Sequence, residues 1–173
     1  MNHNHYILLD AARMDEDMDT AQELNPHFDS LYRGGSKETL AEVAPYLFSF
    51  EKDTEFSQWY LENGWGDSWG ILFSSKASFE ECHKHFRKFL LVKNEKGDEL
   101  YFRFYDPRVL KIFLPACTKE QVIEFFGPVE YFIMEGDTRE QAILFRQIEG
   151  TLTQLEIPVA EVFAGGIVFH YAD

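Results

Sequence analysis

The 173-residue chain has few cysteines and few positive charges. Its two cysteines, Cys82 and Cys117, form no C-x-x-C pair and are too few for a disulfide framework, so we expect both to stay thiols in a reducing compartment. Sixteen lysines and arginines face thirty aspartates and glutamates, which gives a net charge of −14. Nucleic acids and anionic membranes carry the same sign, and the balance therefore argues against both as general partners.

Long hydrophobic runs are missing as well. No apolar stretch approaches the roughly twenty residues that a bilayer-spanning helix requires, so stable membrane insertion is not expected. The opening sequence MNHNHYILLDAARMDED has a short apolar stretch followed by acids, without the basic start and longer apolar run of a signal peptide. These features predict a cytoplasmic protein.

Hydrophobic and aromatic residues are plentiful. They make up 45% and 16% of the chain, with seventeen phenylalanines, and a chain of this length can bury a real core as a single domain over 1–173. Short strand and helix patterns follow one another without an internal repeat. We expect an α/β or α+β fold in which helices pack on a mixed β-sheet.

The local patterns define the expected elements. Apolar and aromatic runs predict strands, which fall at 6–9, 46–50, 70–73, 100–105, 129–135, 141–148, 151–157 and 163–171. An extended segment at 91–93 and a hairpin loop at 94–98 precede the fourth of these strands. Helix signals predict helices, which fall at 15–24, 37–44, 59–61, 79–91, 107–114 and 118–127. Ser36 is the expected cap of the second helix, and Pro115 the expected stop of the fifth.

Two capping boxes and one aspartate cap make three of these helix starts specific. Ser78 with Glu81, and Thr118 with Gln121, each have the spacing in which side chain and backbone satisfy one another's free donors. Asp106 is placed as an N-cap, with Pro107 at the first helical position, where its missing N–H costs nothing.

The net charge is unevenly distributed. Residues 1–75 carry −10, residues 76–119 carry +4 and residues 120–173 carry −8. In the middle block, the helix at 79–91 presents Lys84, Arg87 and Lys88 on the face opposite Cys82 and Phe86. This cationic block is either a mixed solvated surface or a face that meets an acidic partner protein.

Two motifs that suggest chemistry have simpler structural explanations. The segment GWGDSWG at 64–70 has the wrong spacing for a dinucleotide loop and precedes a strand, so we expect a tight loop that lets Trp65 and Trp69 pack closely. Cys82, His83 and His85 do not converge on one helical face, which argues against a metal site. No nucleophile–base arrangement is recognisable, so we expect neither a cofactor nor an enzyme.

Arg103, Asp106 and Arg108 leave two interpretations open. Arg103 falls in the aromatic strand expected at 100–105, where a half-buried guanidinium needs a partner, and Asp106 is the nearest candidate. The first interpretation is an internal Arg103–Asp106 ion pair that fixes a strand–helix corner at Pro107. The second is an exposed corner whose arginines bind carboxylates of a partner.

Residues 85–129 combine the basic helix and the hairpin around Gly97 with the runs FRFYDPRVL (102–110), FL (113–114) and FGP (126–128). With these features, the segment closely resembles the type VI secretion adaptor family, the Tap or TEC chaperones, also described as domain of unknown function 4123. The segments YILLDAA (6–12), LAEVAPYL (40–47) and GWGDSWGIL (64–72) are similar to family segments in the same order. The resemblance covers about residues 5–130.

The resemblance implies a cytoplasmic adaptor rather than an enzyme. Such a protein holds the N-terminal region of a cognate toxic effector, often one with membrane-inserting segments, and loads it onto the C-terminal region of the VgrG spike protein. Longer members carry an additional C-terminal helical lobe, whereas residues 131–173 are expected here to form a β-rich extension. The candidate contact residues are Lys84, Arg87, Lys88, Arg103 and Arg108.

Two other functions remain alternatives to the adaptor. A small enzyme could use the 64–70 loop and nearby acids, and tight ligands would then raise its melting temperature. An immunity protein could neutralise a basic toxin by charge complementarity, and it would protect cells from intoxication rather than support delivery.

Overall fold

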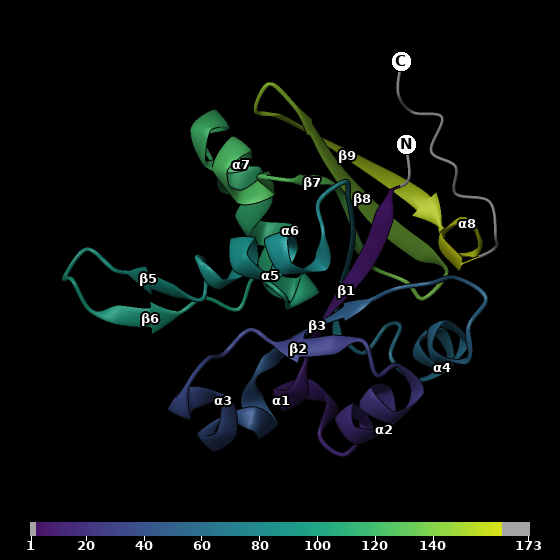
Figure 1. Ribbon diagram of the computed structural model, residues 1–173. Helices are drawn as coiled ribbons and strands as arrows, with labels where there is room; N and C mark the ends of the chain where they lie inside the picture. Colours follow the sequence, from purple (N-terminus) through teal and green to yellow (C-terminus); the bar gives the residue numbers. More distant parts are fainter. Residues whose placement is uncertain (1–2, 164–173) are drawn as a thin grey trace.

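A computed structural model describes residues 3–163, in which helices are interspersed among strands along the chain (Figure 1). The strands are β1 (Asn4–Asp10), β2 (Phe28–Ser30), β3 (Pro45–Ser49), β4 (Gly70–Ser75), β5 (Leu91–Lys93), β6 (Glu99–Tyr101), β7 (Val129–Glu135), β8 (Gln141–Ile148) and β9 (Thr151–Pro158). The helices are α1 (Ala11–Met14), α2 (Asp17–Leu24), α3 (Gly35–Thr39), α4 (Glu55–Asn63), α5 (Phe79–Arg87), α6 (Pro107–Ala116), α7 (Lys119–Phe126) and α8 (Val159–Phe163), with a 3₁₀ turn, η1, at Ala41–Val43.

Within residues 3–163, seven strands form the main sheet in the order β2-β3-β1-β4-β7-β8-β9. Every described pairing in it is antiparallel, so the fold is α+β and the sheet is antiparallel where a mixed one was expected. The single domain with helices on a sheet is confirmed. Three of the four strands expected after Pro128 are also confirmed: β7 pairs with β4, and β8 and β9 extend the sheet by hairpins.

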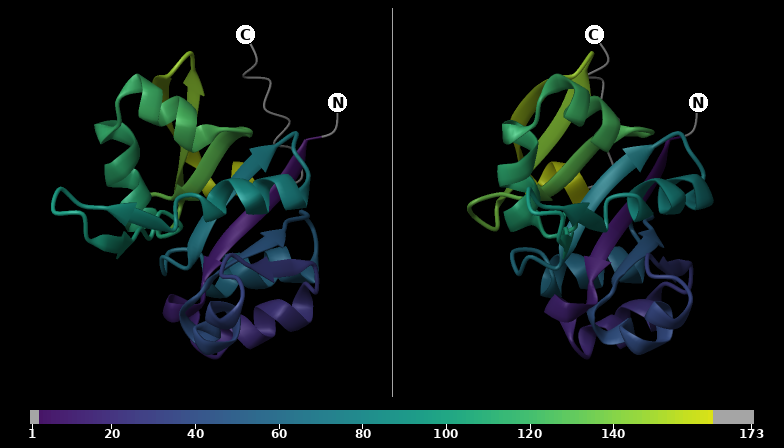
Figure 2. Two further views of the ribbon diagram at one scale, coloured as in Figure 1. Left: turned by 60° about the vertical axis from the view of Figure 1, so that its left-hand side comes forward. Right: turned by 90° about the vertical axis from the view of Figure 1, so that its left-hand side faces the viewer.

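Phenylalanines build the core on one face of this sheet. Phe132 of β7 contacts Phe86 of α5 and Phe125 of α7, with ring centroids 6.2 and 5.5 Å apart, and all three side chains are buried. The opposite face is covered by α4 and α8, where Phe48 stacks on Phe56. Figure 2 shows this arrangement, with helices on both faces of the central strands. Each buried phenylalanine ring removes a large apolar area from water.

Several local expectations differ from the structure for identifiable reasons. The helix expected at 37–44 is replaced by α3 and η1, and Ser36 lies inside α3 instead of capping it. The helix expected at 59–61 begins earlier, because Thr54 and Ser57 form a capping box. Helix α6 includes Pro115, since a proline in the last turn removes only one intrahelical bond.

Two further differences lie around the hairpin. Helix α5 ends at Arg87, after which the Phe89 N–H donates to the Phe86 carbonyl in a tighter turn. The strand expected at 100–105 ends at Tyr101, so Arg103 lies in the turn between β6 and α6 and not on a strand.

The strand expected at 163–171 falls on residues outside the described range, apart from Phe163, which ends α8.

None of the helices within residues 3–163 has both the length and the apolar character needed to cross a bilayer. The longest of them, α6, has ten residues.

Helix α6 offers a matched test of core packing. Leu114 is fully buried, whereas Ile112 on the same helix is 75% exposed. We expect Leu114→Ala to lower the free energy of unfolding by about 2–5 kcal/mol, because a cavity is left, and Ile112→Ala to change it by less than about 0.5 kcal/mol. Urea denaturation of both variants measures the difference, and equal losses would contradict the packing described for α6.

Candidate protein-binding site

Helix α5 carries the cationic face that the sequence predicts. The Ser78–Glu81 capping box forms as expected and fixes where the helix begins, which buries Cys82 and Phe86 against the sheet. Lys84, Arg87 and Lys88 are consequently exposed on the outer side. We call these three residues the basic face.

The members of the basic face are not equivalent. The Arg87 Nε–H donates to the Leu31 carbonyl at 2.9 Å, so this side chain also braces the segment after β2. Within residues 3–163, Lys84 and Lys88 make no side-chain hydrogen bond or ion pair. A partner carboxylate could therefore reach these two ammonium groups without displacing an internal contact.

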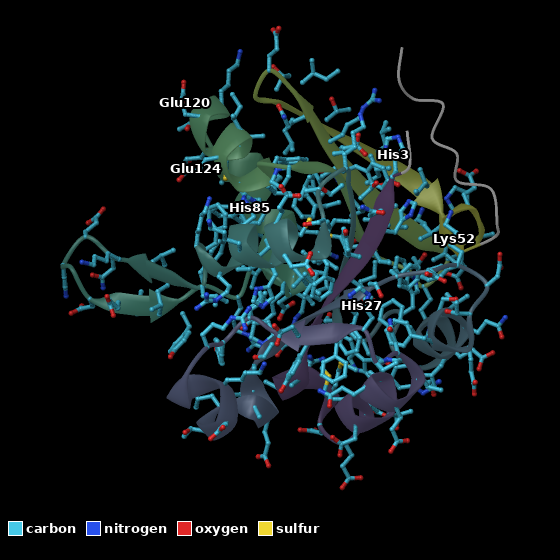
Figure 3. The ribbon with its side chains drawn as sticks, viewed as in Figure 1. His3, His27, Lys52, His85, Glu120 and Glu124 are labelled. Atoms are coloured by element: carbon cyan, nitrogen blue, oxygen red, sulfur yellow. The ribbon has the colours of Figure 1, made fainter. Side chains whose placement is uncertain are left out.

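The histidines of α5 are structural. The His83 Nε2–H donates to the Ser30 carbonyl at 2.7 Å, and the His85 Nε2–H donates to the Phe125 carbonyl at 2.8 Å, which ties α5 to β2 and α7. Figure 3 labels His85 on α5. Burial lowers the pKa of both imidazoles and raises that of the Cys82 thiol to about 11. In residues 3–163, no three His, Cys, Asp or Glu side chains are grouped so that they could hold a metal ion.

The internal ion pair of Arg103 forms with a different residue from the one expected. Its guanidinium donates to the carboxylate of Asp10, at the end of the central strand β1, and not to Asp106. The Asp10 side chain is fully buried, whereas that of Arg103 is 42% exposed. The expectation failed because Asp10 is 93 positions away in the sequence, and no local spacing reveals such a partner.

Asp106 and Pro107 begin α6 as predicted. The Asp106 carboxylate accepts from the Arg108 N–H at 2.9 Å, and Pro107 occupies the first helical turn. The same carboxylate is chelated by the Arg108 side chain, with Nη2–Oδ2 at 2.7 Å. The corner is thus two pairs, Asp10–Arg103 and Asp106–Arg108, and both arginines keep an exposed edge.

The two carboxylates of the corner differ in their electrostatics. Burial raises the pKa of Asp10, and the hydrogen bond from Arg103 only partly opposes this. Burial acts in the same direction on Asp106, but the side-chain and backbone hydrogen bonds of Arg108 outweigh it and lower the pKa. Asp10 therefore depends strongly on its single guanidinium partner.

The glycine loop at 64–70 is filled by a side chain of the protein itself, that of Glu135. One oxygen of Glu135 accepts from the Gly66 N–H at 2.8 Å, and the other accepts from the N–H and the hydroxyl of Ser68, both at 2.9 Å. Gly66 and Ser68 have φ values of 93° and 58°, which point these amides inward. Close packing of Trp69 on Gly64 is confirmed, since a Cβ on Gly64 would lie 2.4 Å from the Trp69 ring.

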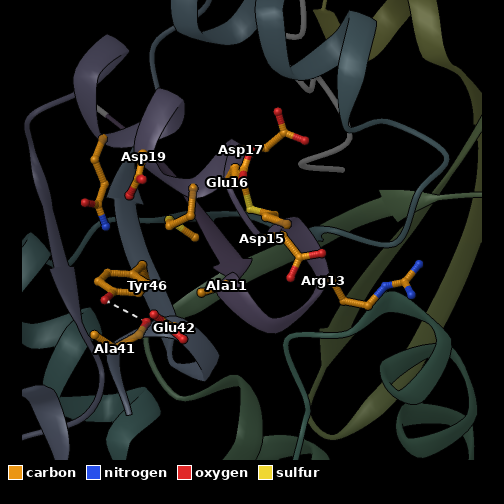
Figure 4. A pocket seen from close by; sticks show the side chains of 12 residues that line it. Ala11, Arg13, Asp15, Glu16, Asp17, Asp19, Ala41, Glu42 and Tyr46 are labelled. Carbon is orange, nitrogen blue, oxygen red and sulfur yellow. Dashed lines mark hydrogen bonds between the residues drawn. The ribbon is translucent and has the colours of Figure 1, made fainter. Parts of the chain in front are cut away.

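An acidic groove lies between α1, α2 and η1 (Figure 4). Its volume is about 970 Å³. Acidic side chains dominate the lining, from Asp15, Glu16, Asp17, Asp19 and Glu42, and Arg13 is the cation that lines it. Such a groove repels phosphates and other anions.

Two residues that hold these sites together, Asp10 and Glu135, were not expected from the sequence. Both are buried carboxylates at strand ends. Asp10 directly follows an apolar run, and that placement was the one signal available for it. Glu135 follows the apolar run of β7 in the same way, but nothing in its surroundings along the sequence indicates the loop that it fills.

The fold and these sites define an α+β protein with a cationic helix, a paired Asp–Arg corner and a glycine loop closed by its own glutamate. Comparison with known families gives a match to a family described as a domain of unknown function, DUF4123, over residues 5–124. The chain therefore belongs to the DUF4123 family. No curated protein and no solved structure gives a significant match.

Loss of the Asp10–Arg103 pair should make the stability of the protein depend on pH. Arg103→Met leaves a buried carboxylate without its cation, so we expect a loss of about 2–3 kcal/mol in the free energy of unfolding near pH 8, discounted because Arg103 is partly exposed. The variant's Asp10 pKa lies further above the unfolded value. A carboxyl shifted in this direction costs stability above its folded pKa, and the cost fades as the pH falls and the group takes up a proton.

The deficit should therefore shrink when denaturation is repeated at lower pH. The double variant Asp10→Asn, Arg103→Met serves as the control, because its amide carries no charge, and it should show little pH dependence in its difference from Asp10→Asn. A deficit of Arg103→Met that is constant between pH 5.5 and 8 would contradict the role assigned to the pair.

The glycine loop gives a second stability test. Glu135→Gln places an amide N–H₂ against donors, and we expect a loss of about 1–3 kcal/mol on thermal or urea unfolding, because one buried donor is left unpaired. Glu156→Gln on the exposed side of β9 is the control and should be close to neutral. Equal behaviour of the two variants would show that the loop does not depend on the Glu135 carboxylate.

Proposed function

We propose that this DUF4123 protein is a cytoplasmic adaptor of a type VI secretion system, which binds a cognate effector and loads it onto the VgrG spike. The observation that carries the proposal is that the exposed cations lie within the segment matched by the family. The basic face and the Asp106–Arg108 pair lie within the family-matched segment, and their cations are exposed in an otherwise acidic chain. Exposed arginines and aromatic side chains suit a surface that binds protein.

We further propose that the chain acts by binding and not by catalysis, with no cofactor. Its glycine loop is filled by Glu135, so the amides that could cradle a phosphate are already used. The neighbouring acidic groove disfavours anionic substrates. The His83 and His85 rings are engaged with backbone carbonyls and are not poised beside a nucleophile.

The acidic groove favours one alternative, an immunity protein that captures a basic toxin. Its volume of about 970 Å³ and its five carboxylates suit a cationic segment. Deletion of the gene separates the two functions. Loss of an adaptor blocks effector delivery and leaves the cell protected, whereas loss of an immunity protein leaves the cell sensitive to its own toxin.

The direct test uses the purified chain with the effector and the VgrG spike that the adaptor function requires. We expect a stable complex with the N-terminal region of the effector and binding to the C-terminal region of the spike, both detected by size-exclusion chromatography and calorimetry. Binding to neither protein would refute the adaptor function.

Charge reversal tests the basic face. Lys84→Glu with Lys88→Glu removes two cations that have no internal partner, so we expect at least about tenfold weaker binding of an acidic partner and a flatter salt dependence. The control is Lys111→Glu with Lys119→Glu, which changes the net charge equally on α6 and α7. Unchanged affinity and salt dependence in the first variant would mean that the basic face is only solvated surface.

A further inference from the structure

The hairpin of β5 and β6 stands apart from the main sheet. It projects from the body of the protein and forms a separate two-stranded sheet (Figures 1 and 2). All six strand residues are exposed. Four are large and apolar, and Leu91, Val92, Leu100 and Tyr101 expose 40–60% of their surface.

The backbone of this hairpin has two open edges within the described part of the chain. The Phe102 N–H donates to the Leu90 carbonyl and the Asn94 N–H donates to the Asp98 carbonyl, which marks these two pairs as hydrogen-bonded. Antiparallel pairs alternate, so Val92 and Leu100 also bond inward. The backbone groups of Leu91 and Lys93 therefore face outward along β5, and those of Glu99 and Tyr101 face outward along β6.

Such an arrangement is unfavourable when left alone. An isolated two-stranded hairpin is marginally stable in water, and an edge strand with exposed apolar side chains is a template for another strand. Proteins usually protect such edges with proline, bulges or several lysines. Here β5 has Lys93 as its only charged residue and contains no proline.

Charge distinguishes the two edges. Residues 82–94, which lead into and form β5, contain Lys84, Arg87, Lys88 and Lys93 and no acid. Residues 95–101, which lead into and form β6, contain three acids and one lysine. The β6 side is also partly occupied, because Tyr101 contacts Tyr32 with ring centroids 5.9 Å apart. The β5 edge is thus the more open and the more positive.

We propose that the β5 edge binds an extended acidic segment of the protein partner as an added antiparallel strand. This inference rests on the proposed adaptor function and names the binding mode and chemistry of its partner. Main-chain hydrogen bonds to Leu91 and Lys93 supply affinity, and the flanking side chains supply selectivity.

The register of β5 specifies which segment fits. Leu91 and Lys93 lie on one face of the hairpin and Val92 on the other, since side chains alternate along a strand. A partner strand running antiparallel then places an acidic residue beside Lys93, a β-branched residue beside Val92 and an apolar residue beside Leu91. Read from its N-terminus, the segment has the order acidic, β-branched, apolar.

The test uses labelled synthetic peptides of about ten residues, the length of a long strand, with the full chain. The first peptide contains Glu-Val-Val at its centre, and the second contains Lys-Val-Val and is otherwise identical. Fluorescence anisotropy should show the glutamate peptide binding at least about tenfold more tightly than the lysine peptide. Absence of binding of the glutamate peptide at about 1 mM, or equal affinities, would overturn the proposal.

Two proline variants identify the edge. Leu91→Pro removes an outward N–H from β5 without removing a donor used inside the hairpin, and Tyr101→Pro does the same on β6. We expect Leu91→Pro to weaken the glutamate peptide at least about tenfold and Tyr101→Pro to change its affinity less than about threefold. Equal losses would show that binding does not depend on the β5 edge.

A charge variant supports the result without a backbone change. Lys93→Glu should reverse the preference and favour the lysine peptide, and an unchanged preference would contradict the predicted register. Sedimentation of the chain alone adds a further outcome. A dimer that Leu91→Pro dissolves would show that a second copy occupies the edge, and the proposal of an acidic partner would then be wrong.

The effector fragment separates this inference from the adaptor function. If wild-type chain binds the effector and Leu91→Pro binds it equally well, the edge proposal fails and the adaptor function stands. If wild-type chain binds neither effector nor spike, the adaptor function fails, and the peptide affinities alone decide whether the edge accepts an acidic strand.

Discussion

The buried carboxylate of Asp10 is the contact on which the rest of the molecule depends. Asp10 ends the central strand β1. Its backbone N–H donates to the Trp69 carbonyl, and its side chain accepts from the Ala12 N–H at the start of α1. Arg103 then brings a guanidinium from the turn before α6. One carboxylate thus connects the sheet, the first helix and the segment that follows the hairpin, and removal of its cation would leave a charge buried without compensation.

The contact between Asp10 and Arg103 also orders the segment that follows the hairpin. The turn at 102–106 is fixed at one end by Arg103 and at the other by Asp106, which caps α6. The hairpin projects from the beginning of that turn, and the basic face lies on the helix before the hairpin. Helix α5 itself is packed on the sheet through Cys82 and Phe86, so its exposed cations are held on an ordered helix before a partner binds.

Elements with local signals were predictable from the sequence. Capping boxes, an aspartate followed by proline, and apolar runs fixed α5, α6, α7 and the last three strands, because each signal acts within a few residues. The cationic helix face followed from the same periodicity. The partner of Arg103 and the occupant of the glycine loop could not be predicted, because Asp10 and Glu135 reach these places only through the pairing of strands distant in sequence. The prediction that the strand extends through Arg103 was wrong for a related reason. Phe104 and Tyr105 are buried in a turn, and aromatic residues pack as well in a buried turn as in a strand.

Glu135, which fills the glycine loop, lies outside the segment that the family match covers. The family match ends at residue 124, whereas Glu135 lies beyond it, on the strand that covers the open side of β4. A fragment cut at the family boundary would leave the Gly66 and Ser68 amides without their acceptor and would expose one edge of β4. The segment covered by the family match is therefore smaller than the folded unit, because the residues that follow it complete both the sheet and the glycine loop.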